Sequence, residues 1–308
     1  MKPLLVALLL FQGSASVPKP GIDHIRAVGD TVWFEGNRGF DSVRIRYCYV
    51  PGTGAWCRFP RPTPGRTPDL NVPQSPKDSV VITPGFTLRC RGHAEAGSYC
   101  ETFGIFTADD RREHWLVPRI TAAGREQLLK AIGLETEEPP SMSGSVTAFA
   151  ATNDAIWLGL GGGFPEGEGA FGGLLRFDRA RRTAETIIHP GLASATVTGL
   201  AVVGEELWVG TAHPGEFGYA GATGILRRDL RTGDWKTADS ATTPLPDNLV
   251  QTLGAVAGVV CVATRDGLAV FDPRARRWAV RYFRRTIVRD STVFALAAVR
   301  PPDEPRQF

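Results

Sequence analysis

Carboxylates and histidines in glycine-rich stretches are the residues of this sequence that could do chemistry. Two carboxylates about 5 to 10 Å apart can act as acid and base in glycoside cleavage. The sequence does not fix that distance, and two solvated charges in a Gly-rich loop are the competing interpretation for Glu166 and Glu168. The candidate site residues are Asp41, His93, Glu95, Tyr99, Glu166, Glu168, His213, Glu216 and Tyr219.

A metal site is the second chemistry that these residues allow. His93 with Glu95, and His213 with Glu216, could contribute ligands from two loops. Two such loops without a third clear donor are a weak match to the three or four protein ligands of a zinc site. The sequence therefore predicts no metal and no other cofactor.

Known catalytic motifs are missing or stand in the wrong context. Residues 167–172 match G-x-G-x-x-G, but the strand-like segment 174–177 follows, where a nucleotide site needs the start of a helix. The sequence contains no G-x-S-x-G, H-E-x-x-H or P-loop. The catalytic residues, if any, stay unknown at this point.

A repeat of about fifty residues defines the elements that must position these groups. Residues 197–201 (VTGLA) lead to 207–211 (LWVGT), then to 224–229 (GILRRD) and 232–235 (TGDW). The same order recurs from Val146 and from Val250, so the period is 51 and then 53 residues. A period near fifty with several short strands per unit is typical of a propeller blade or a comparable radial β-repeat.

Turn residues and apolar runs divide each unit into four strands, first to fourth from the inside outward. The second strand is apolar at consecutive positions, which indicates a sheet covered on both faces. The predicted fold class is all-β, a β-propeller of four-stranded blades with about five blades, an incomplete sixth and one short helical insert. The expected units span about 22–60, 80–118, 146–189, 197–238, 250–283 and, in part, 291–308.

The sixth unit begins at residues 293–297 (VFALA) and then stops, because the prolines of 301–305 cannot continue a ladder strand. The sequence therefore predicts an open ring. Three explanations remain: the chain is a fragment of a six- to eight-bladed protein, the lone strand closes against the first unit, or a second copy completes the ring.

Two linkers interrupt the repeat. Residues 60–76 hold six prolines and are expected to form an extended surface segment. The linker 119–144 contains a predicted short helix over 121–133, which Thr121 can cap and Gly133 can end. A helix packed over a blade edge is favoured over a helix that binds a partner.

Loop lengths predict the rim on which a site would lie. In a four-stranded blade, the loops from the second to the third strand share a rim with the connections between blades. Here those loops are the long ones, at 37–41, 92–99, 161–172 and 212–223, whereas the opposite rim has tight turns. Binding groups accumulate on loops set on a rigid scaffold, so the long-loop rim is the predicted binding surface.

The units from 146 to 283 resemble the propeller repeat of bacterial two-component-regulator sensors, on residues 207–211 followed by 224–226 and an aspartate. The glycine run 161–163 and the trailing tryptophan are also similar to kelch-type repeats. The resemblance implies a propeller fold and a sensing role in an extracytoplasmic input domain. It carries over no catalytic residue.

The start of the chain and its cysteines predict a compartment. Lys2, the apolar run 4–11 and the small residues 14–16 are typical of a cleaved signal peptide over residues 1–16, leaving 17–308 as a single domain. Two local disulfides are expected across hairpins, with Cys261 left as a buried free thiol. The expected pairs are Cys48 with Cys57 and Cys90 with Cys100. The predicted location is periplasmic or secreted.

Charge excludes some partners. The chain holds 35 Lys and Arg against 32 Asp and Glu, a net charge of +3, which is too low for a nucleic-acid binder. No segment of the mature chain is long enough to span a membrane, and the arginines of 179–182 and 274–277 are interpreted as solvated turn charges.

The predicted function is an exported, non-catalytic β-propeller that binds a ligand or protein partner through its long-loop rim, with sensing as an expected role. Two alternatives stay open: an extracytoplasmic hydrolase or lyase that uses rim carboxylates with or without a divalent cation, and a structural interaction scaffold.

Overall fold

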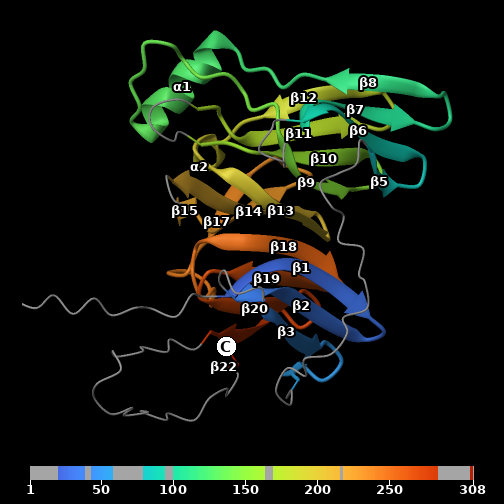
Figure 1. Ribbon diagram of the computed structural model, residues 1–308, viewed down its shortest axis with the longest axis vertical. Coiled ribbons are helices and arrows are strands. Elements are labelled where there is room, and N and C mark those ends of the chain that lie inside the picture. The colour runs from blue at the N-terminus through green and yellow to red at the C-terminus, as the bar shows by residue number, and fades with distance from the viewer. Residues whose placement is uncertain are drawn as a thin grey trace, which may run out of the picture.

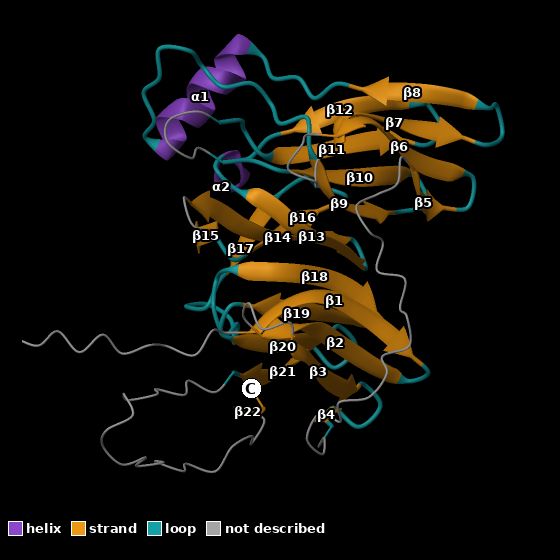
Figure 2. Cartoon of the chain, viewed as in Figure 1, coloured by secondary structure: helices purple, strands orange, loops and turns teal. Residues whose placement is uncertain are grey.

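The protein consists mainly of β-strands. The computed structural model describes residues 20–38, 43–57, 79–93, 100–163, 169–215, 218–283 and 306–307. Its strands form five antiparallel sheets, each built on a path of four neighbouring strands, which confirms the all-β class and the four-stranded units. The sheets follow one another along the long axis of the molecule in a propeller-like arrangement (Figures 1 and 2).

The five sheets are numbered in chain order. The first consists of β1 (Pro20–Val28), β2 (Thr31–Arg38), β3 (Val43–Val50) and β4 (Ala55–Trp56). The second consists of β5 (Ser79–Thr83), β6 (Phe86–His93), β7 (Cys100–Thr107) and β8 (Arg112–Leu116). The third consists of β9 (Val146–Ala151), β10 (Ala155–Leu160), β11 (Gly173–Asp178) and β12 (Thr183–Ile187).

The last two sheets each carry an additional strand. The fourth consists of β13 (Thr196–Val203), β14 (Glu206–Gly215), β16 (Ile225–Asp229) and β17 (Trp235–Ala238), with β15 (Gly218–Gly221) paired to the end of β14. The fifth consists of β18 (Val250–Val256), β19 (Val259–Thr264), β20 (Gly267–Asp272) and β21 (Arg277–Tyr282), with β22 (Arg306–Gln307) on its outer edge.

The second strands of the third and fifth sheets are buried along their whole length. β10 and β19 are buried at every position, as their apolar runs predict for a sheet covered on both faces. Three tryptophans of the repeat lie at the same register position, opposite one residue of the first strand and one of the third. These are Trp33 (opposite Arg26 and Cys48), Trp157 (opposite Ala150 and Arg176) and Trp208 (opposite Ala201 and Arg227).

Aspartates close the turns between third and fourth strands. Asp178 Oδ1 accepts hydrogen bonds from the amides of Ala180 and Arg181, at 3.0 and 2.8 Å. Asp229 and Asp272 repeat the arrangement at the ends of β16 and β20. Backbone hydrogen bonds lower the pKa of Asp178 and of Asp229, which keeps both carboxylates ionised and committed to the turn.

Neighbouring sheets pack face to face. Their first strands lie side by side in the order β5, β9, β13, β18, β1. One apolar cluster fills each of four junctions: second with third sheet, third with fourth, fourth with fifth, and fifth with first. In the part of the chain that the structure describes, no such cluster joins the first sheet to the second.

A hydrogen bond between a side chain and the backbone also crosses three of these junctions near the start of the first strands. The pairs are Thr147 Oγ1 to Val197 O at 2.6 Å, Thr198 Oγ1 to Val250 O at 2.8 Å, and Ile22 N to Gln251 Oε1 at 3.0 Å. The first sheet therefore follows the fifth in the same way that the fifth follows the fourth. Figure 1 shows this contact as blue strands beside orange ones.

The expected sixth unit and the Pro-rich linker fall largely outside the described residues. Residues 293–299 and residues 60–76 both lie outside the described residues. Of the expected sixth unit, the structure describes only β22, which pairs with Ala279 and Val280 of β21.

Among the residues that the structure describes, two helices lie in the connections between consecutive sheets. The predicted helix α1 (Ala122–Ile132) is present: Thr121 Oγ1 accepts from the amide of Gly124 at 3.1 Å, and Gly133, at φ 67°, ends it. Leu128 packs into the cluster between the second and third sheets. The four-residue helix α2 (Pro190–Ala193) was not predicted, because it is too short to show periodicity. Neither described helix is long and apolar enough to cross a membrane.

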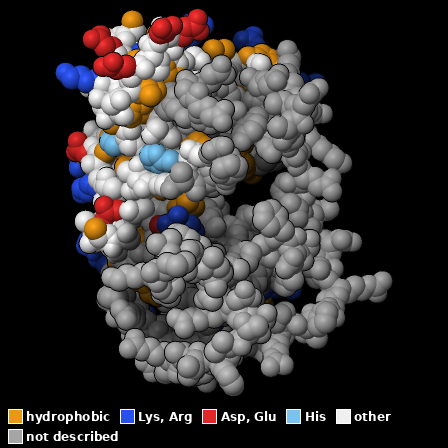
Figure 3. Space-filling view, turned by 60° about the vertical axis from the view of Figure 1, so that its left-hand side comes forward, with side chains coloured by type: hydrophobic (Ala, Val, Ile, Leu, Met, Phe, Trp, Pro, Cys, Tyr) orange, Lys and Arg blue, Asp and Glu red, His pale blue; other side chains and the backbone are white. Residues whose placement is uncertain are grey.

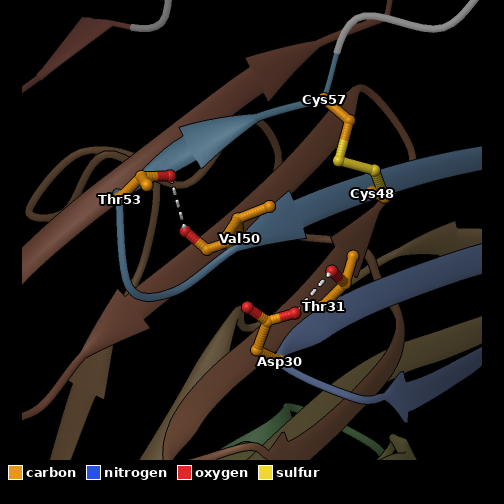
Figure 4. Close-up of a disulfide and its surroundings, with 6 residues drawn as sticks. All are labelled: Asp30, Thr31, Cys48, Val50, Thr53 and Cys57. Carbon is orange, nitrogen blue, oxygen red and sulfur yellow. Dashed lines mark hydrogen bonds between the residues drawn. A yellow bond between two sulfur atoms is a disulfide. The ribbon is translucent and has the colours of Figure 1, made fainter.

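A disulfide closes the hairpin of β3 and β4. Cys48 and Cys57 are bonded, with their Cα atoms 5.3 Å apart, and Figure 4 shows the bond at the open end of the hairpin. Cys90 is also disulfide-bonded, while the side chain of Cys100 lies outside the described part. Cys261 is free and fully buried, as predicted.

The arginines of the turn after β11 were interpreted as solvated charges, and this interpretation is wrong for two of them. The guanidinium carbons of Arg179 and Arg182 lie 4.6 and 5.1 Å from the ring centre of Phe86 on β6. Arg179 also donates to the carbonyl of Thr152 at 2.7 Å, and Arg182 pairs with Asp109. These arginines therefore link the third sheet to the second.

Candidate functional site

The long connections of the third and fourth sheets meet on one rim. Gly163, where the β10–β11 loop begins, packs so tightly on Pro214 of β14 that a Cβ at this glycine, whose φ is 148°, would overlap the proline ring. The amide of Gly172 donates to the carbonyl of Ala193 in α2 at 3.0 Å. Figure 1 shows α1, α2 and β15 on the same side of the molecule, opposite the hairpin turns.

A polar cluster joins α2 to the end of β14 on this rim. It consists of Ser194, His213 and Thr223, which we call the hydroxyl–histidine cluster. Ser194 Oγ lies 3.3 Å from His213 Nδ1, and Thr223 Oγ1 lies 3.2 Å from His213 Nε2. All three residues are half-buried. The cluster therefore connects Ser194 to residues that lie 19 and 29 positions later in the sequence.

The hydrogen bonds around Thr223 fix the protonation of the imidazole. Thr223 Oγ1 donates its single proton to the carbonyl of Gly191 at 3.1 Å, so it can only accept from His213. Nε2 of His213 therefore carries the ring proton. Burial lowers the pKa of His213 and keeps the ring neutral, which leaves a lone pair on Nδ1 facing the hydroxyl of Ser194.

Thr211 supports the cluster from beneath. Its hydroxyl is fully buried, donates to the carbonyl of Gly224 at 2.8 Å and accepts from the amide of Thr223 at 3.2 Å. These two bonds hold the segment before β16 against β14. The position of Thr223 Oγ1 is therefore set by backbone contacts as well as by its own hydrogen bonds.

His189 positions α2 over the fourth sheet. Its Nδ1 accepts from the amide of Gly191 at 3.1 Å, and its ring centre lies 4.7 Å from that of Trp235. Burial, and then the charge of Arg228, lower the pKa of His189. A neutral His189 is therefore the N-cap that places Ser194 beside His213.

The space-filling view shows how this side of the molecule is composed. Figure 3 brings the rim forward: histidine side chains reach the surface among uncharged and hydrophobic atoms, and charged side chains lie above, beside and below them.

Of the nine predicted site residues, only His213 has a described side chain. His93 ends β6 and Tyr219 lies on β15, but their side chains are outside the described part. The others lie outside it altogether, namely Asp41, Glu95, Tyr99, Glu166, Glu168 and Glu216. Among the described residues, no group of three or more His, Cys, Asp or Glu is arranged to hold a metal ion.

Sequence reasoning missed Ser194 and Thr223. Ser194 stands among small residues between two units, and Thr223 is one of several threonines near β16. No motif or periodicity marks either residue. Their role follows only from the fold, which brings α2 against the end of β14.

Comparisons with known proteins add little to this geometry. No family model and no curated protein matches the sequence. Two similar solved structures are extracellular domains of BT4673 from B. thetaiotaomicron, described as a one-component system in one case and as a hybrid two-component system in the other. They are 13% and 11% identical over 80% and 83% of this chain, with TM-scores of 0.38 and 0.39. The chain spans 26% and 27% of their lengths, and at these scores the likeness carries no conclusion about function.

Proposed function

We propose that the protein is an extracytoplasmic binding module of the sensory kind. In this proposal the five sheets are blades of a β-propeller with an incomplete sixth blade. A ligand or protein partner binds on the long-loop rim, where the connections of neighbouring sheets meet. The resemblance of units 146–283 to two-component-regulator repeats supports the sensing role.

One observation carries the proposal: in the part of the chain that the structure describes, the long-loop rim holds elements that depart from the four-stranded repeat. Both described helices, the added hairpin strand β15 and the hydroxyl–histidine cluster lie there, while the opposite rim has turns closed by aspartates. A scaffold that keeps one rim minimal and elaborates the other presents the elaborated rim for binding.

The location rests on the disulfide of the first sheet. A disulfide across a hairpin persists in an oxidising compartment and is rare in the cytosol, so the bond between Cys48 and Cys57 agrees with an extracytoplasmic location. Cleavage of residues 1–16 as a signal peptide is part of the proposal, since these residues lie outside the described part.

Ligand-induced stabilisation tests the binding function. Thermal unfolding of the full chain is measured with a panel of amino acids, nucleosides, mono- and disaccharides, and di- and tricarboxylic acids. A compound at about one hundred times its dissociation constant stabilises the folded state by about 2.7 kcal/mol. We expect a stabilising compound to lose much of its effect in Thr223→Val, because this change removes a polar group from the rim.

The matched control is Thr232→Val, in the turn between β16 and β17 on the opposite rim. A compound that stabilises wild type and Thr232→Val but not Thr223→Val supports rim binding. Rim binding is contradicted if the compound protects amides from exchange only in the turns at residues 179–182 and 230–233.

A further inference from the structure

Ser194 has the surroundings of a nucleophile. A serine hydroxyl becomes nucleophilic when a neutral base accepts its proton and a third group holds that base in the correct tautomer. His213 Nδ1 is the base, at 3.3 Å from Ser194 Oγ, and Thr223 Oγ1 is the orienting group, at 3.2 Å from Nε2. Such distances are typical of a site without substrate, where catalytic hydrogen bonds are often long.

We propose that Ser194 is a base-activated nucleophile that takes an acyl group from an ester. This activity goes beyond the binding function and does not depend on it. His213 acts as the base through Nδ1, and Thr223 acts as a positioning residue through Nε2. None of the three residues is fully buried.

The reaction balances with an ester and water as the only co-reactants. Ser194 Oγ bonds to the carbonyl carbon of the ester while its proton passes to Nδ1 of His213. That proton then goes to the departing alkoxide as the carbon–oxygen bond breaks, which leaves acyl-Ser194 and an alcohol. Water, deprotonated by Nδ1, then attacks the acyl carbon, releases the acid and returns the proton to Ser194 Oγ.

The backbone around α2 limits how fast this reaction runs. The amides of Ser194 and Ala195 both donate to the carbonyl of Leu192, and that of Gly172 donates to Ala193. These amides are therefore engaged and do not serve as an oxyanion hole, whose single donors contribute about 10²- to 10³-fold to rate. We therefore expect both acylation and deacylation to be slow, with acylation the faster step for an ester of a good leaving group such as p-nitrophenolate.

Covalent labelling of the full chain tests the proposal. A fluorophosphonate reagent reacts with base-activated serines by losing fluoride, and mass spectrometry locates the modified residue. We expect label on Ser194 and a labelling rate about 10²- to 10⁴-fold lower in His213→Ala, the usual contribution of a general base. Thr223→Val should lower the rate less, because the base remains while its tautomer is no longer fixed.

Two further readouts separate a nucleophile from a structural network. In wild type the labelling rate should fall on acidification through the pKa of His213, which burial places below the ordinary histidine value. p-Nitrophenyl acetate should give a burst of about one p-nitrophenolate per chain, following the acyl-enzyme scheme. Ser240→Ala, which removes an exposed serine, serves as the control and should label like wild type.

The proposal is overturned by either of two results in protein that is folded by circular dichroism. One is an absence of label on Ser194 in wild type. The other is an equal labelling rate in wild type, His213→Ala and His213→Gln, which means that the cluster only fastens α2 to β14. Both results leave the binding function untouched, since labelling requires no rim ligand.

Discussion

The junction between the third and fourth sheets and the junction between the fourth and fifth repeat the same contacts with different polar partners. Trp157 faces the fourth sheet in one, and Trp208 faces the fifth in the other. The indole N–H of Trp208 donates to Glu206 at 3.2 Å, whereas that of Trp157 is buried without a partner among the described residues. Ala155, the counterpart of Glu206, supplies no acceptor.

The aromatic surroundings differ as well. Trp208 stacks on Phe271 with ring centres 5.2 Å apart and lies 5.9 Å from Trp278. Trp157 lies in a cluster with aliphatic side chains of the fourth sheet and with Trp235, whose ring packs on His189. The repeat therefore preserves the position of the indole, and each junction supplies its own stabilising contacts.

The largest expected effect comes from removing the two indoles. Replacement of a buried tryptophan by alanine costs about 3 to 5 kcal/mol of unfolding free energy. Trp208→Ala should exceed Trp157→Ala by about 1 to 3 kcal/mol, because it also removes a hydrogen bond and aromatic contacts. Urea unfolding followed by far-UV circular dichroism measures the difference. Equal losses would show that the polar partner and the aromatic stack contribute nothing.

Replacement by phenylalanine isolates the indole N–H. Trp208→Phe removes a satisfied donor and should cost about 1 to 2 kcal/mol more than Trp157→Phe, which removes a buried donor without a partner. The same urea titration applies. A larger loss of unfolding free energy for Trp157→Phe contradicts the comparison. In a Glu206→Ala background, the loss caused by Trp208→Phe should approach the loss caused by Trp157→Phe.

The threonines that cross the junctions should have smaller and similar effects. Thr147→Val and Thr198→Val each remove a hydroxyl that donates to the next sheet, with an expected loss of about 1 kcal/mol. The two variants serve as controls for each other in urea unfolding. If only one of the two variants loses unfolding free energy, the hydrogen bond has the same geometry at both junctions but stabilises only one of them.

Acid should also distinguish the two junctions. Burial lowers the pKa of His213 and His189, which both lie at the third–fourth junction, so the unfolded state binds more protons below the unfolded pKa of about 6.5. Stability therefore falls as pH decreases from 7 to 5, by at most about 1.4 kcal/mol per pH unit for each histidine.

A matched pair of variants assigns this pH dependence. His213→Gln should flatten the decrease in unfolding free energy between pH 7 and 5, whereas Thr198→Val should keep the wild-type slope at lower stability. Urea midpoints at several pH values measure both. If the slope of unfolding free energy against pH is unchanged in His213→Gln, His213 does not contribute to the loss of stability in acid.

The sequence predicted the parts of the fold that depend on local chemistry. The tryptophan of the second strand, the helix between Thr121 and Gly133, and the hairpin disulfide of Cys48 all follow from patterns within a few residues. Helix α2 was missed, since a four-residue helix has no periodicity. The arginines at 179 and 182 were misinterpreted because their contact with Phe86 joins two sheets.

The candidate site was less predictable. His213 was selected for its residue type and its rim loop, but its partners Ser194 and Thr223 come from other segments, and tertiary contact alone unites them. The other site candidates without described side chains stay predictions.

The contact of the first sheet with the fifth has a kinetic consequence during synthesis. Ile22 bonds to a residue 229 positions later, so the apolar face of β1 and β2 has no partner until most of the chain has been translated. At about 5 to 20 residues per second, that interval is roughly 10 to 45 s. A nascent chain with this topology exposes apolar, aggregation-prone surface for that whole time. It depends on chaperones or on delayed folding until Gln251 emerges.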